Sequence, residues 1–183
     1  MHVKVFDLAA AYLESKHSLT TVGAFMSPSH DDYVSGKFHG KEFIRARDRV
    51  HMCTLATDDH PFLRVSSWES EQKSFIDFPD VARAINESLM KQFNGHVRLV
   101  YVCGTDHVRK CGLSIGIRPN ILVCAIRRPG YDAFETKNCF VYDAGFLLCI
   151  CFFVHFLHIV GDFMQKPSCL LCIMYYFCVG YRS

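Results

Sequence analysis

A short apolar run that ends in glycine and an acid constrains the fold of this chain more than any other feature. Val97 to Cys103 is almost continuously apolar, which is typical of a strand in a parallel sheet covered on both faces. It ends at Gly104 and Asp106, the strand–glycine–acid turn of a nucleotide-binding α/β unit. Gly104 permits close approach of a ligand to the backbone. Asp106 either caps the next helix or accepts a hydrogen bond from a ribose hydroxyl. Asn120 to Ile126 repeats the buried-strand pattern, so we expect an α/β fold.

Two further strands are each followed by a polar cluster. The strand that begins at Leu19 should stop at Ser27-Pro28, because proline lacks a donor for the sheet ladder. The strand from Phe62 to Val65 precedes the single tryptophan, Trp68. Open α/β sheets bind ligands beyond the carboxyl ends of their strands, so these clusters predict a ligand site. The indole of Trp68 could stack on an aromatic ligand, or it could be a partly buried structural side chain.

Three segments have the pattern of helices. His2 to Ser15 places apolar residues at i, i+3, i+4 and i+7. Glu42 to Thr57 is the second predicted helix, and Phe78 to Phe93, with proline in its first turn, is the third. Between the first strand and the second helix, Val34 to Lys41 is basic and interrupted by glycine, so we predict a loop there.

Composition excludes several classes of protein. The 183 residues suffice for one domain with a core, and a net charge of +2 with a pI near 8 argues against a nucleic-acid partner. The ten cysteines lie mostly within apolar runs, and the N-terminus reads as an amphipathic segment rather than a signal peptide. We therefore expect a reducing, intracellular compartment (nucleus or cytoplasm) and no disulfide framework. His155 with His158, or Cys169 with Cys172, could suggest a metal, but neither pair has a matching second pair at ligand spacing, so no metal site is predicted.

The charge distribution divides the chain near Asp143. Residues 144–183 hold only three charged side chains, Asp162, Lys166 and Arg182. We therefore predict an α/β domain at 1–143 and a hydrophobic, Cys- and Phe-rich helical tail at 144–183. Residues 144–161 are uncharged and approach the roughly 20 residues that a membrane-spanning helix needs, which makes a membrane anchor one interpretation of the tail.

Several of these clusters together resemble one family, the eukaryotic nicotinamide/nicotinate mononucleotide adenylyltransferases. The resemblance covers roughly residues 1–132, with gaps, and implies a Rossmann-like nucleotidyltransferase sheet, mostly parallel, with helices on both faces. That sheet is expected to be incomplete, because the family's first strand with its Gly-Ser-Phe-Asn-Pro loop and its final Ile-Ser-Ser-Thr-Lys-Ile-Arg turn are not found here. A tail that departs from the family's ending could also reflect read-through or alternative coding. The matching residues are Ser27-Pro28 with Asp31 and Tyr33, Arg49-Val50-His51-Met52 with Leu55-Ala56, and Trp68-Glu69-Ser70 with Gln72.

The resemblance also implies roles for individual residues. His2, at the start of the first helix, would act catalytically against ATP phosphate, although from the residues alone it could be a disordered residue near the chain start. Lysines of the basic loop would contact phosphate, although they could instead be solvated surface side chains. The same alternative applies to the arginine in the list that follows. The nucleotide-binding candidates are Lys37, Lys41, Trp68, Glu69, Ser70, Gly104, Asp106 and Arg128.

The activity that the resemblance implies is adenylyl transfer from ATP to nicotinamide or nicotinate mononucleotide, which gives the dinucleotide and pyrophosphate. Mg²⁺ would arrive with ATP, since no carboxylate cage is visible. Each missing phosphate-binding element could cost about 10²–10³ in rate, so we expect weak or no turnover. The alternatives are a non-catalytic, membrane-associated scaffold and a generic nucleotide-binding module. A homo-oligomer is left open.

Overall fold

The computed structural model describes residues 2–39, 42–118, 120–143 and 173–181, with the side chain of His2 and most side chains of the last segment outside the description. Helices and strands alternate along most of this length. In chain order they are α1 (His2–His17), β1 (Leu19–Pro28), α2 (Asp31–Phe38), α3 (Ala46–Thr57), β2 (Leu63–Val65), α4 (Phe78–Gln92), β3 (Arg98–Gly104), α5 (Thr105–Cys111), the 3₁₀ helix η1 (Leu113–Ile115), β4 (Ile121–Ile126), β5 (Cys139–Tyr142) and β6 (Ile173–Tyr181).

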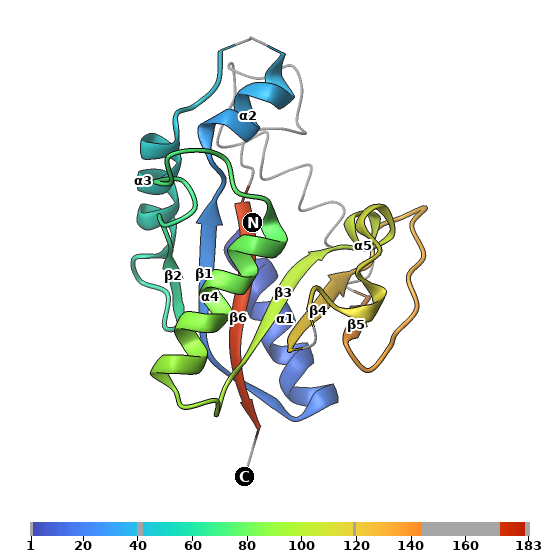
Figure 1. Ribbon diagram of the computed structural model, residues 1–183. Coiled ribbons are helices and arrows are strands. Elements are labelled where there is room, and N and C mark those ends of the chain that lie inside the picture. The colour runs from blue at the N-terminus through green and yellow to red at the C-terminus, as the bar shows by residue number, and fades with distance from the viewer. Residues whose placement is uncertain (1, 40–41, 119, 144–172, 182–183) are drawn as a thin grey trace.

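The strands form one six-stranded sheet in the order β2-β1-β6-β3-β4-β5. Among the described strands, β1 to β5 all point the same way, and β6 runs antiparallel to both of its neighbours, β1 and β3. Its pairing with β1 extends from Leu19↔Tyr181 to Pro28↔Ile173. In Figure 1, β6 is the red strand that lies between the two parallel groups.

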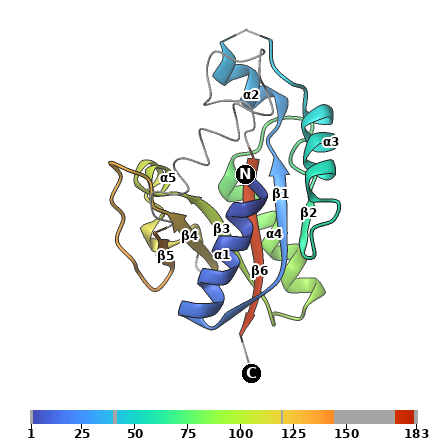
Figure 2. The same ribbon diagram turned by 180° about the vertical axis from the view of Figure 1, so that it is seen from behind.

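Helices cover both faces of the sheet, which gives two hydrophobic cores. Figure 2 shows α1 across one face, and Figure 1 shows α4 across the other. Along β3, Val100 and Val102 pack in the core under α1, whereas Leu99 and Tyr101 pack in the core under α4. This alternation explains why the strand is apolar almost throughout. The predicted Rossmann-like α/β sheet, mostly parallel and covered on both sides, is confirmed.

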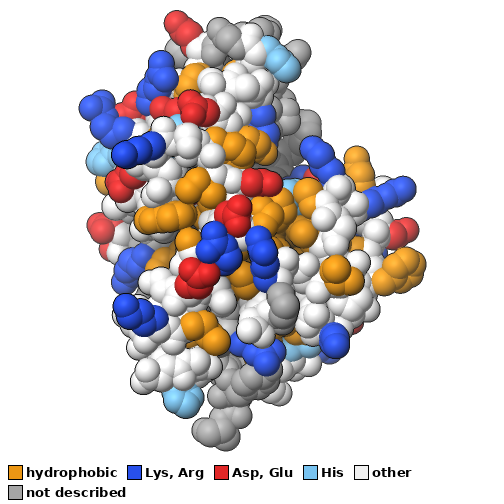
Figure 3. Space-filling view, viewed as in Figure 1, with side chains coloured by type: hydrophobic (Ala, Val, Ile, Leu, Met, Phe, Trp, Pro, Cys, Tyr) orange, Lys and Arg blue, Asp and Glu red, His pale blue; other side chains and the backbone are white. Residues whose placement is uncertain are grey.

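The outer face of α4 is solvated. Its apolar side chains point into the core, and Figure 3 shows side chains of both charges beside one another over this helix. Arg83 pairs with Asp80 and with Glu87, and Arg118 reaches Asp80 from outside the helix. Exposed pairs of this kind add little to stability, so α4 serves mainly to bury its side of the sheet.

Two of the predicted segments differ in the structure. The predicted loop at Val34 to Lys41 is wrong over its first part, because α2 runs through Phe38. The ring of His30 caps this helix by accepting from the backbone N–H of Asp32, and acidic residues in the first turn suit the helix dipole. The second predicted helix begins at Ala46 rather than at Glu42.

The described part of the expected helical tail is a strand. Ile173–Tyr181 is rich in β-branched and aromatic residues, which suit a sheet, and its backbone pairs on both sides. Residues 144–172, which include the predicted anchor at 144–161, lie outside the described residues. No helix in the part of the chain that the structure describes is long and apolar enough to span a membrane. The domain division at residue 143 stays a prediction.

Candidate functional site

The parallel strands bring two groups of polar side chains to the same edge of the sheet, where their carboxyl ends meet. The first group lies beyond β1 and β2, and the second beyond β3 and β4. Between them lies β6, which separates β1 from β3. The first group consists of Ser27, Asp31, Arg49 and Glu69, and the second of Gly104, Thr105, Asp106 and Arg128.

Glu69 is the buried carboxylate of the first group. Only 1% of its surface is exposed, and its Oε2 accepts a hydrogen bond of 2.6 Å from the Ser27 hydroxyl. The backbone N–H of Ser66 donates to Met26 at 2.7 Å, which holds this loop against the end of β1. Burial raises the pKa of the Glu69 carboxyl, while the hydrogen bond from Ser27 and the charge of Arg49 act in the opposite direction. Its Oε1 has no hydrogen-bond partner among the described residues.

Substitution of Glu69 by Gln should change how stability depends on pH. A raised pKa in the folded state means that the folded protein binds more protons than the unfolded one, so this group's contribution falls as pH rises from about 4.3 through the raised value. Glu69→Gln, which keeps the shape and an acceptor for Ser27, should lose that decline. Urea unfolding at a series of pH values measures it. Parallel curves for the two proteins would contradict the prediction.

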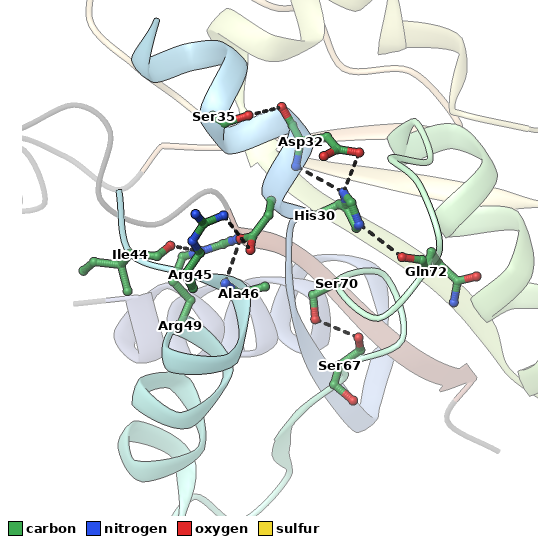
Figure 4. Close-up of polar contacts among 11 residues, drawn as sticks. His30, Asp32, Ser35, Ile44, Arg45, Ala46, Arg49, Ser67, Ser70 and Gln72 are labelled. Carbon is green, nitrogen blue, oxygen red and sulfur yellow. Dashed lines mark hydrogen bonds and ion pairs between the residues drawn. The ribbon is translucent and has the colours of Figure 1, made fainter. Parts of the chain in front are cut away.

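Arg49 is a fully buried cation that connects the start of α2 to the start of α3. Its Nη2 donates to Asp31 Oδ1 at 2.8 Å, and its Nε donates to the Ile44 carbonyl at 2.9 Å. The same Asp31 oxygen accepts from the backbone N–H of Ala46 at 2.7 Å. Figure 4 shows these contacts converging on one point between the two segments. Asp31 thus anchors both the helix start and the guanidinium.

The Trp68 loop presents its ring outward. Trp68 is 40% exposed, while its carbonyl accepts from the side-chain amide of Gln72 at 2.7 Å. The hydroxyl of Ser70 donates to the Ser67 carbonyl at 2.8 Å, so it serves the loop's own fold. The loop's own hydrogen bonds therefore hold the backbone of Trp68, and its side chain is partly exposed.

An open pocket of about 580 Å³ lies between α2 and the segment after this loop. Lys37 holds its Nζ 4.4 Å from the centre of the Tyr33 ring, and that ring stacks on Phe75 at 5.1 Å. Aromatic faces beside a cation suit a ligand with a flat ring and an anionic group. The pocket is lined by Asp32, Tyr33, Gly36, Lys37, His39 and Phe75.

The second group is built around Gly104. The Thr105 hydroxyl accepts from the backbone N–H of Arg128 at 2.9 Å, and Arg128 Nη1 donates to Asp106 Oδ2 at 3.3 Å. A Cβ on Gly104 would collide with Asp106 Oδ1 and lie 2.5 Å from Arg128 Nε. Both side chains therefore lie directly over the glycine, and they leave no room for a Cβ at this position.

Of the two roles left open for Asp106, the helix cap is not observed. Gly104 is the N-cap of α5 and no side chain caps it, while Asp106 lies in the first turn of the helix. The reason is its competing partner: Asp106 turns toward the guanidinium of Arg128. Its Oδ1 is buried without a hydrogen bond among the described residues, and it is an acceptor at the strand ends.

Burial lowers the pKa of His107, the residue after Asp106. The charge of Asp106 acts in the opposite direction, while the positive charges of Lys110 and Lys37 add to the lowering.

The structure thus gathers most of the predicted residues at one edge, in two groups. Trp68, Glu69 and Ser70 share one loop. His2 begins α1, but its side chain is not described, and Lys41 lies outside the described residues. Gly104, Asp106 and Arg128 form the second group, and Lys37 lies on α2.

Two residues at this edge were missed by the sequence analysis, Ser27 as the donor to Glu69 and His30 as the helix cap. A small hydroxyl residue at the end of a buried strand was the available signal for Ser27. No local signal marked His30. No group of three His, Cys, Asp or Glu side chains in the described ranges could hold a metal ion.

Comparison with known proteins gives consistent relatives. The chain is 31% identical over 97 residues to a nicotinamide-nucleotide adenylyltransferase of Drosophila melanogaster, covering 53% of this chain and 23% of that protein. It is 30% identical over 95 residues to nicotinamide/nicotinic acid mononucleotide adenylyltransferase 2 of Xenopus tropicalis, covering 51% and 29%. For nicotinamide/nicotinic acid mononucleotide adenylyltransferase 1 of Bos taurus, the identity is 33% over 89 residues, covering 49% and 30%. No family model matches.

The fold and the polar strand ends define a nucleotidyltransferase-like α/β protein. Over about half of its length, the chain is similar to nicotinamide/nicotinate mononucleotide adenylyltransferases. It spans less than a third of the length of the three relatives described above.

Proposed function

We propose that this protein transfers the adenylyl group of MgATP to nicotinamide or nicotinate mononucleotide in the biosynthesis of NAD. One observation carries the proposal. The Trp68 loop, with its outward indole and buried Glu69, lies at the same sheet edge as the Gly104, Asp106 and Arg128 group. A pyridine nucleotide needs an aromatic surface and a nearby carboxylate at one end, and ATP needs close backbone approach and a cation at the other.

In this reaction a phosphate oxygen of the mononucleotide attacks the α-phosphorus of ATP in line. A new oxygen–phosphorus bond forms as the bond to pyrophosphate breaks, and no covalent enzyme intermediate is needed. The protein contributes position and charge. In our proposal, Trp68 stacks on the pyridine ring. Arg128 and Lys37 bind phosphate oxygens, and Asp106 Oδ1, which has no hydrogen-bond partner among the described residues, accepts a hydrogen bond from a ribose hydroxyl. His2 and Lys41 remain proposed phosphate contacts.

Trp68→Ala tests the assignment. Loss of ring stacking costs about 1–3 kcal/mol in nucleic-acid binders, so the KM for the mononucleotide should rise about tenfold or more while the KM for ATP stays near its original value. The measurement is dinucleotide formation in a coupled assay with ATP, Mg²⁺ and either mononucleotide. Phe134→Ala, which removes an aromatic ring that is 83% exposed, is the matched control and should leave both constants unchanged.

A protein that neither forms dinucleotide nor binds either mononucleotide would overturn the proposal. Binding of ATP without the mononucleotide would instead favour the generic nucleotide-binding module. The weak turnover expected from the sequence stays a prediction of the same assay.

A further inference from the structure

We propose that His30 is a positioning residue that sets the Trp68 loop, and through it the affinity for the mononucleotide. The inference rests on the proposed function only for its kinetic part. The positioning itself rests on a continuous line of hydrogen bonds from the end of β1 to the indole-bearing residue.

The ring of His30 uses both of its nitrogens. Nδ1 accepts from the backbone N–H of Asp32 at 3.1 Å, which caps α2, and Nε2 lies 3.1 Å from the Gln72 carbonyl. Since a carbonyl only accepts, Nε2 carries the proton and donates, which agrees with Nδ1 as the acceptor. Figure 4 shows the ring between α2 and the Gln72 segment, and its side chain is only 12% exposed.

Gln72 in turn contacts Trp68. Its carbonyl receives the hydrogen bond from His30, and its side-chain amide donates to the Trp68 carbonyl at 2.7 Å. The loop's remaining bonds between Ser67 and Gln72 are largely internal. Side-chain hydrogen bonds from Ser27 to Glu69 and from His30 to Gln72 connect the end of β1 and the residues after it to this loop.

Both anchors come from the residues that follow the apolar part of β1. Ser27 bonds to Glu69, the residue after Trp68, and His30 bonds to Gln72 at the far end of the loop. A loop held at both ends loses less conformational freedom when a ligand stacks on its exposed ring, which strengthens binding without new ligand contacts. His30 should therefore influence binding of the pyridine end rather than the phosphoryl step.

Two substitutions separate the two bonds of this ring. In His30→Asn, the short amide can still cap α2 but no longer reaches the Gln72 carbonyl. In His30→Gln, the longer amide can keep the donor to Gln72 and gives up the cap. Trp68 is the single tryptophan of the chain, so its fluorescence reports on this loop alone.

In His30→Asn, we expect acrylamide to quench Trp68 fluorescence about twofold faster, and the KM for the mononucleotide to rise about fivefold, the effect of one lost hydrogen bond. The kcat and the KM for ATP should stay within about twofold. His30→Gln should keep the quenching and the KM of the original protein, even if its melting temperature falls through loss of the cap.

Unchanged Trp68 quenching in His30→Asn, or an equal change in both variants, would overturn the inference. The quenching needs no catalysis. If the protein formed no dinucleotide, the proposed function would fail. The fluorescence measurement would still decide whether His30 positions the loop.

Discussion

Replacement of Arg49 by alanine should lower the free energy of unfolding by about 3 kcal/mol, because removal of one partner of a buried ion pair leaves the other uncompensated. Arg49 is fully buried and donates to Asp31 and to the Ile44 carbonyl. Its charge also favours the ionised form of Glu69. Its loss would leave a cavity, an unsatisfied carbonyl and two carboxylates without their nearest cation. Urea denaturation followed by circular dichroism measures the change.

Arg47→Ala is the matched control for this experiment. Arg47 lies on the same helix, α3, but its side chain is 92% exposed and pairs only loosely with the neighbouring Asp48 at 3.4 Å. Exposed pairs contribute about 0–1 kcal/mol, so this variant should unfold almost like the original protein. Equal effects from the two arginines would show that burial of the Arg49 charge carries no special weight.

Gly104→Ala should weaken ATP binding by about tenfold to a hundredfold while leaving the fold intact, the range expected for loss of one hydrogen bond to a charged group. The added methyl would collide with the Asp106 carboxyl and come within 2.5 Å of Arg128 Nε. Both atoms belong to partly exposed side chains, 35% for Asp106 and 53% for Arg128, so these side chains can move aside without disturbing the sheet. The expected loss is therefore one of ligand affinity, measured by titration with MgATP.

Gly23→Ala provides the control, since an added Cβ there meets only the Phe62 carbonyl at 4.0 Å. It should bind MgATP like the original protein. If Gly104→Ala also bound MgATP normally, the group beyond β3 and β4 would not be the ATP end of the site. A large fall in melting temperature for Gly104→Ala would show instead that the glycine is needed for packing.

The sequence predicted the central strands well because their composition follows from burial. Val97 to Cys103 is apolar except for Arg98, since alternate residues enter two different cores. The helix α2 escaped prediction because it has only eight residues, includes Gly36 and is capped by a histidine, which is not among the preferred capping residues. For Ile173–Tyr181, an uncharged run fits a buried strand or a helix equally, and only its distant pairing partners decide between them.

For the site, local sequence marked which loops are polar but not which side chains meet. Trp68 and Glu69 were found as a motif, yet the bond from Ser27 to Glu69 depends on β1 and β2 being neighbours in register. A cap on its own helix, which is a local interaction, was one of the two roles left open for Asp106. Asp106 pairs instead with Arg128, which the register of β3 and β4 brings to it.

The place of β6 has a consequence for how the chain folds. Within the described sheet, β1 with β2 and β3 with β4 and β5 are joined through β6 alone, whose pairing partner Leu19 lies at the opposite end of the sequence. Contacts so distant in sequence make folding slow, because loop-closure entropy must be overcome before they form. Until Ile173–Tyr181 is inserted, β1 and β3 each present an unpaired edge that invites association with other chains. Once this segment has been synthesised and inserted, the edges of β1 and β3 should no longer be open to association with other chains.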